Sequence, residues 1–319
     1  MTSRGVTTVG AGTWTRRHLL DVDELSRHDL EDILDLAVEM RARRAAGELP
    51  DPLRGTTMGL AFYEASTRTR VSFELAAREL GATTTDLSVA GSSVAKGESL
   101  VDTLRTLERT GIRFLVLRHA ASGAPYLAAR SLDRAGILNA GDGTHAHPTQ
   151  ALLDALTLRE ALGALNGTRI VIVGDAVHSR VARSNLLAMV RMGASVVLSG
   201  PPAWVNPFVG WPGVTVVGEL AAALAGADAV MALRVQLERA AGSGVPSLAE
   251  YTNRWGLTAE RLEAACPDAW LLHPGPANEG VEITAELSAT PRSLIGRQVE
   301  NGVPIRMAVL SMLAEADRW

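Results

Sequence analysis

Residues 64–70 read Glu-Ala-Ser-Thr-Arg-Thr-Arg and combine three small hydroxyl side chains with two arginines. Ser66 and Thr67 are residue types that cap helices, and apolar residues then recur at helical spacing until Gly81. A helix that begins here directs unpaired backbone N–H groups and the positive end of its dipole out of the turn. Such a turn can bind phosphate or another oxyanion. The plainer interpretation is a capped helix with solvated arginines, but two arginines so close to the cap favour anion binding.

More arginine and histidine side chains follow the ends of other apolar segments. They are Arg118 and His119, the run from His145 through His147 to Gln150, Arg180, Arg234 with Gln236, and the run His273-Pro274-Gly275-Pro276. Any one of these alone is equally well a solvated loop charge. Because ligands bind at the carboxyl ends of parallel strands, we expect the whole set to converge on one cationic site.

Apolar periodicity identifies the elements that must position these residues. We expect helices at residues 23–46, from the Ser-Thr-Arg turn to 80, and at 99–110, 148–162, 181–192 and 304–314. We expect strands at 58–63, 83–89, 114–117, 137–140, 169–173, 195–198, 214–217, 229–233 and 270–272. This alternation predicts an α/β fold with two domains, each a parallel β-sheet flanked by helices. The expected divisions are 1–150 and 151–300, with a C-terminal helix in 301–319 that packs back on the first domain.

Composition narrows the class of protein. A length of 319 residues suits two domains, and a net charge of −4 argues against a broad nucleic-acid surface. No apolar run approaches the roughly 20 residues of a membrane helix, and the N-terminus lacks a signal-peptide core. The single cysteine, Cys266, excludes an intramolecular disulfide. We therefore expect a cytoplasmic protein with neither a membrane nor a nucleic acid as partner.

Other motifs that bind cofactors do not fit this chain. Residues 173–178 follow a strand and precede a helix, but they lack the glycine spacing of a dinucleotide fingerprint. The chain has no Gly-Lys-Ser/Thr phosphate loop either. His145 and His147 are too close in sequence for a helical zinc pair, and no cysteine lies near them. We expect no cofactor and no metal.

Taken together, the motifs resemble the aspartate carbamoyltransferases of the aspartate/ornithine carbamoyltransferase superfamily. The segments that carry the resemblance are 62–74 (FYEASTRTRVSFE), 92–98 (SSVAKGE), 139–154 (NAGDGTHAHPTQALLD), 173–185 (VGDAVHSRVARSN), 233–239 (LRVQLER) and 273–276 (HPGP). The last two are more particular to enzymes that use aspartate, whereas the ornithine enzymes have a cysteine in the equivalent of the His-Pro-Gly-Pro loop.

The resemblance implies a chemistry. The amine of L-aspartate attacks the carbonyl carbon of carbamoyl phosphate, giving N-carbamoyl-L-aspartate and phosphate in de novo pyrimidine biosynthesis, without a cofactor. The implied carbamoyl phosphate-binding set, in the first domain, is Ser66, Thr67, Arg68, Thr69, Arg118, His147 and Gln150, of which Arg68, Thr69, Arg118 and His147 are catalytic. Thr69, Arg118 and His147 stabilise negative charge on the carbonyl oxygen. Gln150 accepts from the carbamoyl NH₂ and so rejects acetyl phosphate.

The second domain is implied to bind aspartate. The implied residues are Lys96, Arg180, Arg234, Gln236, Gly275 and Pro276, with Glu64 and Glu238 as partners that aim the arginines. The resemblance also implies a homotrimer with shared active sites, in which the loop with Ser92 and Lys96 enters a neighbouring chain's site. Association with a regulatory chain or a dihydroorotase stays open.

Two positions depart from the family pattern. Ala120 stands where the family usually has proline, and Glu279 stands where it usually has arginine. Glu279 is the only sequence support for the alternative of a paralogous carbamoyltransferase with a different amino-acid-like acceptor. A third alternative, a catalytically silent scaffolding subunit, is disfavoured because the arginines, His147 and Gln150 are all present. An Arg68→Ala variant separates an enzyme from a scaffold: abolished turnover supports an enzyme, whereas unchanged function in a partner assay supports the scaffold.

Overall fold

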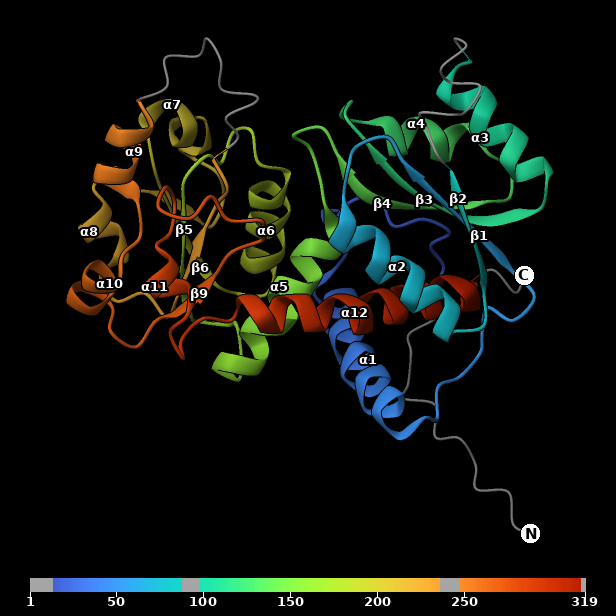
Figure 1. Ribbon diagram of the computed structural model, residues 1–319, viewed down its shortest axis with the longest axis horizontal. Coiled ribbons are helices and arrows are strands. Elements are labelled where there is room, and N and C mark those ends of the chain that lie inside the picture. The colour runs from blue at the N-terminus through green and yellow to red at the C-terminus, as the bar shows by residue number, and fades with distance from the viewer. Residues whose placement is uncertain (1–13, 88–97, 236–246, 317–319) are drawn as a thin grey trace.

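The computed structural model describes residues 14–87, 98–235 and 247–316. Four residues singled out from the sequence, Ser92, Lys96, Gln236 and Glu238, lie outside these ranges. The described chain forms two parallel β-sheets flanked by helices, as predicted (Figure 1).

The first sheet contains β1 (Thr57–Phe62), β2 (Thr83–Leu87), β3 (Ile112–His119) and β4 (Gly136–Asp142) in the order β2-β1-β3-β4. Every neighbouring pair is parallel. The chain runs outward from β1 to β2 and then returns to the other side of β1. This reversal opens a crevice at the carboxyl ends of β1 and β3, the place where open parallel sheets bind ligands.

The second sheet contains β5 (Arg169–Val173), β6 (Ser195–Ser199), β7 (Val214–Val216), β8 (Ala229–Ala232) and β9 (Trp270–Leu272) in the order β7-β6-β5-β8-β9. Its pairs are also all parallel. Helices cover both faces, which explains the unbroken apolar run in β5. The strand order reverses between β5 and β8, so a second crevice opens at their carboxyl ends.

The helices are α1 (Arg27–Ala46), α2 (Thr67–Glu79), α3 (Leu100–Arg109), α4 (Ala124–Ser131), α5 (Pro148–Leu162), α6 (Arg180–Arg191), α7 (Pro202–Val205), α8 (Leu220–Leu224), α9 (Leu248–Trp255), α10 (Ala259–Ala265), α11 (Ala285–Ser288) and α12 (Ile295–Ala316). A short 3₁₀ turn, Asn206–Phe208, follows α7. The predicted limits of α5, β5 and β9 are confirmed.

Two predicted helices begin several residues away from their expected starts. The first starts at Arg27 instead of 23, because Ser26 and Asp29 form a capping box that fixes its N-terminus. The last starts at Ile295 instead of 304 and contains Pro304 in its interior. Proline removes one helical hydrogen bond, but packing of α12 along α1, α2 and α5 sustains the helix through it. Helix α4 and the short helices α7 to α11 were not predicted.

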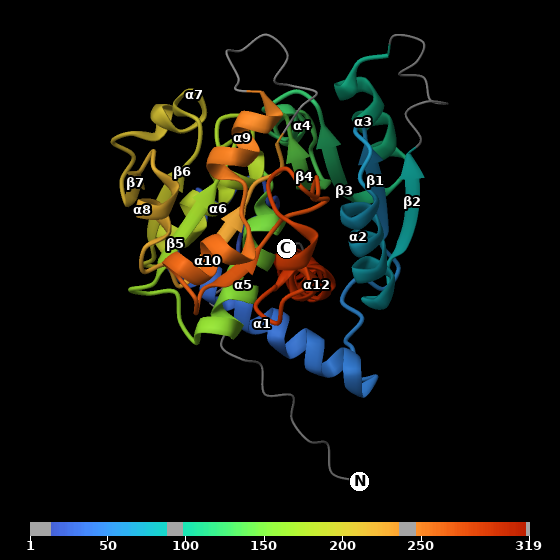
Figure 2. The same cartoon turned by 60° about the vertical axis from the view of Figure 1, so that its left-hand side comes forward.

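Helices α5 and α12 join the two halves of the molecule. In Figure 1, helix α12 runs from beside α5 to the first half of the molecule, where it lies near α1 and α2, and Figure 2 shows it nearly end-on between α5 and α2. One apolar cluster extends from Leu30 and Phe73 through Leu310 to Leu198 and Leu272 in the second sheet. The predicted return of the C-terminal helix to the first half is confirmed by its contacts with α1 and α2.

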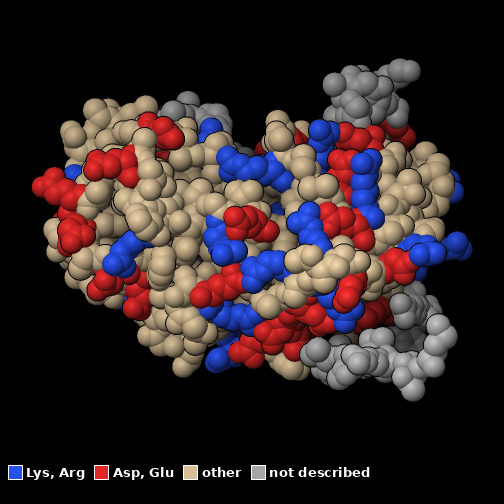
Figure 3. Space-filling model, turned by 60° about the horizontal axis from the view of Figure 1, so that its bottom comes forward, with Lys and Arg blue, Asp and Glu red and all other residues tan. Residues whose placement is uncertain are grey.

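The surface that carries α1 has interspersed charges of both signs (Figure 3). Arg44 pairs with Glu79 there at 2.6 Å, and Arg159 pairs with Asp35 at 2.6 Å. None of the described helices is both long enough and apolar enough to cross a membrane.

Candidate active site

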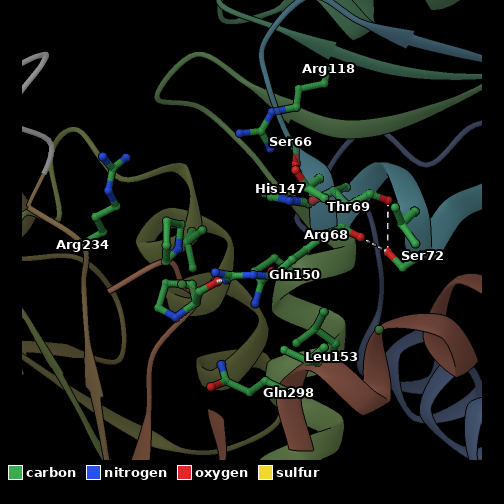
Figure 4. Close-up of a pocket in the computed structure, with 18 of the residues that line it drawn as sticks. Ser66, Arg68, Thr69, Ser72, Arg118, His147, Gln150, Leu153, Arg234 and Gln298 are labelled. Atoms are coloured by element: carbon green, nitrogen blue, oxygen red, sulfur yellow. Dashed lines mark hydrogen bonds between the residues drawn. The ribbon is translucent and has the colours of Figure 1, made fainter. Parts of the chain in front are cut away.

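One pocket of about 860 Å³ lies at the carboxyl edges of both sheets. The first half contributes the turn after β1, Arg118 at the end of β3, and the start of α5. The second half contributes the start of α6, Arg234 after β8, and the loop after β9. In Figure 4, Arg234 lies across the pocket from Ser66, Thr69 and Arg118. Both crevices created by the strand order therefore open into one space.

Helices α2, α5 and α6 begin at this pocket. Ser66 is the N-cap of α2 and has extended backbone, but its side chain makes no capping hydrogen bond. His147 is the N-cap of α5, and Ser179 caps α6 by accepting from the backbone N–H of Ala182. The positive ends of three helix dipoles thus converge on the pocket, which favours an anion there.

The turn between β1 and α2 places Arg68 in the pocket and holds it against the second half. Its Nη1 lies 3.4 Å from the carbonyl oxygen of Pro274. A Cβ at Gly275 would lie 1.8 Å from the same Nη1, and Gly275 has a φ of 62°. The positive φ favours glycine at 275, and the missing Cβ leaves room for the Arg68 guanidinium. Ser72 supports the turn by donating to the carbonyl oxygens of Arg68 and Thr69 at 2.7 and 3.0 Å.

Glu64 lies between two arginines from different halves. Its Oε2 accepts from Arg180 Nη1 at 2.8 Å and lies 3.6 Å from Arg118 Nε. Gly141 provides the space for both guanidinium groups, since a Cβ there would lie 2.9 Å from Arg180 Nε and 3.2 Å from Arg118 Nη1. The expected pairing of Glu64 with an arginine is confirmed, and it links the two crevices.

His147 is buried and its imidazole is held in the neutral form. Burial lowers its pKa well below 6.5, and the charges of Arg118, Arg180 and Arg306 lower that pKa further. The backbone N–H of His147 donates to Ser184 Oγ at 2.9 Å, and its Nδ1 has no hydrogen-bond partner among the described residues. A neutral imidazole can donate one hydrogen bond to a carbonyl oxygen without competing for a proton.

Gln150 is oriented by a buried carboxylate that the sequence reasoning missed. Its Nε2 donates to Asp154 Oδ1 at 2.9 Å. Gln298 Nε2 and Asn185 Nδ2 also donate to Asp154, at 2.7 and 2.8 Å. Burial raises the pKa of Asp154 to about 6, so the group remains largely ionised at neutral pH. Because the amide nitrogen of Gln150 faces Asp154, its side-chain oxygen is the atom left to accept a hydrogen bond in the pocket.

The segment that carries Arg234 is held by the loop after β9. Glu282 accepts from the backbone N–H of Val235 at 3.1 Å and from Asn278 Nδ2 at 3.1 Å. His273 accepts from the backbone N–H of Gly275 at 2.8 Å through Nδ1. Asn278 and Glu282 were not singled out from the sequence, where nothing distinguishes them from surface polar residues.

Several residues expected near the site point elsewhere. Arg70 pairs with Asp86 on the outer side of α2. His145 Nδ1 lies 3.1 Å from Asp142 Oδ2, and the His119 ring lies 5.0 Å from that of Tyr63. None of these three lines the pocket. Their exclusion corrects the expectation that every strand-end cation converges on one site, because the pleat and the helical phase turn alternate side chains away.

The two departures from the family pattern also lie off the pocket lining. Glu279 is exposed and is absent from the described residues that line the cavity. At Ala120, the turn is closed without proline, because the backbone N–H of Ala121 donates to His119 Nδ1 at 2.9 Å. Among the described residues, no group of three or more His, Cys, Asp and Glu side chains is arranged to hold a metal ion.

The fold and the pocket define a two-sheet α/β protein with an anion site between its halves, and family models identify its class. The model described as aspartate/ornithine carbamoyltransferase, carbamoyl-P binding domain, matches residues 17–160. The model of the Asp/Orn binding domain of the same family matches residues 166–313. The chain belongs to the aspartate/ornithine carbamoyltransferase family, and this makes it a carbamoyltransferase.

Two individual relatives have names that are more specific than those of the family models. The chain is 49% identical to the aspartate carbamoyltransferase catalytic subunit of Roseiflexus sp. (strain RS-1), over 94% of this chain and 95% of that protein. It is also 49% identical to the same subunit of Chloroflexus aurantiacus (strain ATCC 29366 / DSM 635 / J-10-fl), over 95% and 99% of the two chains.

Solved structures give the same fold. Aspartate transcarbamoylase from Trypanosoma cruzi, in complex with carbamoyl phosphate and aspartate, has a TM-score of 0.83 and 31% identity, with 92% of this chain and 96% of that chain covered. Ornithine carbamoyltransferase from Pyrococcus furiosus has a TM-score of 0.84 and 25% identity, with 94% and 97% covered. The fold alone therefore does not distinguish the two acceptors.

Proposed function

We propose that this chain transfers the carbamoyl group of carbamoyl phosphate to the amine of L-aspartate, giving N-carbamoyl-L-aspartate and phosphate. The observation that carries the proposal is the placement of Arg180 and Arg234 in the pocket with the turn that begins α2. Two guanidinium groups suit a dicarboxylate, whereas the cationic side chain of ornithine would be repelled by them. The 49% identity to aspartate carbamoyltransferase catalytic subunits supports the same choice of acceptor.

In this proposal the N-terminus of α2, with Ser66, Thr67, Arg68 and Thr69, holds the phosphate group. The carbonyl oxygen becomes negative as the amine attacks, and Thr69, Arg118 and neutral His147 stabilise it. Gln150 accepts from the carbamoyl NH₂ through the oxygen that Asp154 leaves available. A C–N bond forms, the C–O bond to phosphate breaks, and the departing phosphate takes the amine proton. Positioning and electrostatics supply the rate enhancement.

The acceptor set in the proposal is Lys96, Arg180, Arg234, Gln236, Gly275 and Pro276. We divide the chain into a carbamoyl phosphate-binding domain, 1–150, an acceptor-binding domain, 151–300, and a C-terminal helix in 301–319 that returns to the first domain. The family models also divide the chain in two, but they meet between residues 160 and 166, and the second model includes most of α12. We further propose a cytoplasmic homotrimer in which Ser92 and Lys96 of one chain complete a neighbour's site, acting in pyrimidine biosynthesis.

The Arg234→Gln variant tests the choice of acceptor. We expect the KM for aspartate to rise by about tenfold or more, with little change in the KM for carbamoyl phosphate. Arg54→Gln, at a side chain that is 83% exposed, is the matched control and should behave as the wild type. An unchanged KM for aspartate in Arg234→Gln, or turnover of ornithine by the wild type, would contradict the proposal.

A further inference from the structure

The wall of the pocket contains a buried arginine that the proposed chemistry has not used. Arg306, on α12, lines the cavity and is 2% exposed. Its guanidinium lies 4.8 Å from the centre of the Phe73 ring on α2. Its Nη1 donates to the carbonyl oxygen of Gly302, one helical turn earlier, at 2.7 Å. Stacking on Phe73 and this hydrogen bond fix the position of the charge.

No carboxylate within residues 14–87, 98–235 and 247–316 forms an ion pair with Arg306, and its Nε has no hydrogen-bond partner there. Burial lowers the pKa of Arg306 to about 9, which still leaves the guanidinium charged at neutral pH. Buried charges are usually paired, because an uncompensated one is costly. The cost is sustained here beside a pocket at which three helix N-termini also converge.

The local packing places this charge next to Phe73 and near Ser72, about one helical turn from the anion-binding turn of α2. A Cβ at Gly302 would lie 3.0 Å from Arg306 Nη1 and 3.9 Å from Ser72 Cβ, so glycine leaves room for the guanidinium next to α2. The hydroxyl of Ser72 in turn donates to the carbonyl oxygens of Arg68 and Thr69. The charge of Arg306 also reaches His147, whose pKa it helps to lower. Its field therefore acts on the part of the pocket where the phosphate and the carbonyl group are proposed to lie.

We propose that Arg306 is a further anion-stabilising residue of this site, and that its unbalanced positive charge is matched when a phosphate group enters the pocket. The inference rests on the proposed function for the identity of the anion. The charge is held in place before the ligand arrives, so little reorganisation accompanies binding. Arg306 should then destabilise the ligand-free protein and stabilise the phosphate-bound protein.

Inorganic phosphate is the probe, with the wild type and the Arg306→Met variant compared by calorimetric titration and thermal unfolding. We expect the variant to bind phosphate about tenfold or more weakly, because a favourable charge is lost. We expect its ligand-free Tm to be equal to or above that of the wild type, because a buried unpaired charge is removed. Arg306→Lys should retain most of the affinity for phosphate. Arg297→Met, on the same helix at a side chain that is 49% exposed, is the matched control.

If Arg306 has a purely structural role, the Arg306→Met variant has a lower ligand-free Tm than the wild type or does not fold. Either result overturns the inference. Phosphate binding by folded Arg306→Met as tight as that of the wild type also overturns it, while the proposed function survives. If the wild type itself binds neither phosphate nor carbamoyl phosphate, the proposed function fails and the inference fails with it.

Discussion

Single residues in this site depend on partners that fix their donors and acceptors before a substrate arrives. Gln150 and Arg180 are each held by a carboxylate, from Asp154 and Glu64 respectively. The residue types at the strand ends could be predicted from the sequence, as could the role of Glu64. The orientation of Arg70 and His145 away from the pocket could not, because side-chain direction depends on helical phase and on nearby acids such as Asp86. Asp154 had a detectable signal, since it lies four residues after Gln150 on one predicted helix.

Asp154→Asn tests the orientation of Gln150. An asparagine removes the negative charge that receives three amide donors, so Gln150 should lose its fixed orientation. We expect kcat/KM for carbamoyl phosphate to fall by about tenfold or more, and discrimination against acetyl phosphate, measured as a competitive inhibitor, to narrow. Asp35→Asn, at a side chain that is 65% exposed, serves as the control. If the binding of carbamoyl phosphate and that of acetyl phosphate weaken equally, Asp154 does not act through Gln150.

The lowered pKa of His147 predicts a pH dependence of stability. In the unfolded chain this histidine takes up a proton near its ordinary pKa of 6.5, but in the folded protein it stays neutral below that pH. The unfolded state then binds more protons, so the free energy of unfolding falls as the pH falls below 6.5. When the pH is lowered from 7.5 to 5.5, the free energy of unfolding should fall by about 1 kcal/mol more in the wild type than in His147→Asn.

Urea unfolding at the two pH values measures this difference. The raised pKa of Asp154 acts in the opposite direction, but it is common to both proteins and cancels in the comparison. His28→Asn, at a side chain that is 72% exposed, is the control variant. An identical pH dependence in wild type and His147→Asn would mean that the buried imidazole titrates normally.

Secondary-structure elements determine why the site lies where it does. The strand order reverses once in each sheet, and α2 and α6 begin at those reversals with the residues that line the pocket. The alternation of helices and strands was sufficient to predict both sheets. The early start of α12 was not predictable, since Pro304 marks a helix start in sequence and only tertiary packing carries the helix through it.

Leu310→Ala tests the contribution of α12, which joins the two halves together with α5. Leu310 is fully buried in the cluster that extends across both sheets. We expect the free energy of unfolding to fall by about 3 kcal/mol, with both halves still unfolding in one transition. Chemical denaturation followed by circular dichroism and tryptophan fluorescence measures this. Val299→Ala, 55% exposed on the same helix, should cost far less. Separate transitions for the two halves in the wild type would contradict the prediction.

At the scale of the whole molecule, the position of the pocket between the halves bears on two properties: the movement of the halves on substrate binding and the association of chains into an oligomer. The anion-binding turn and the acceptor arginines belong to different halves, so we expect the halves to approach one another when both substrates are bound. The proposed contribution of Lys96 from a neighbouring chain would make the site complete only in an oligomer.

Mixing two inactive variants tests whether sites are shared. Lys96→Ala and Arg68→Ala are each expected to be inactive. If sites are shared, each takes Arg68 from one chain and Lys96 from its neighbour. In trimers formed at random from equal amounts of the two variants, about a quarter of the sites have both residues intact, so about a quarter of wild-type activity should return. Unmixed samples that are treated identically provide the control. No recovery in a mixture shown by sedimentation to contain hybrid trimers would exclude shared sites.

The central claim is the transfer of a carbamoyl group to aspartate, and product analysis tests it most directly. Purified protein is given carbamoyl phosphate labelled with ¹³C at the carbonyl carbon, together with an equimolar mixture of L-aspartate, L-ornithine and the other amino acids. The products are then identified by NMR and mass spectrometry. We predict labelled N-carbamoyl-L-aspartate as the sole enzymatic product, lost in Arg68→Ala. Carbamoylation of a different amine, or consumption of carbamoyl phosphate no faster than in buffer alone, would contradict the account.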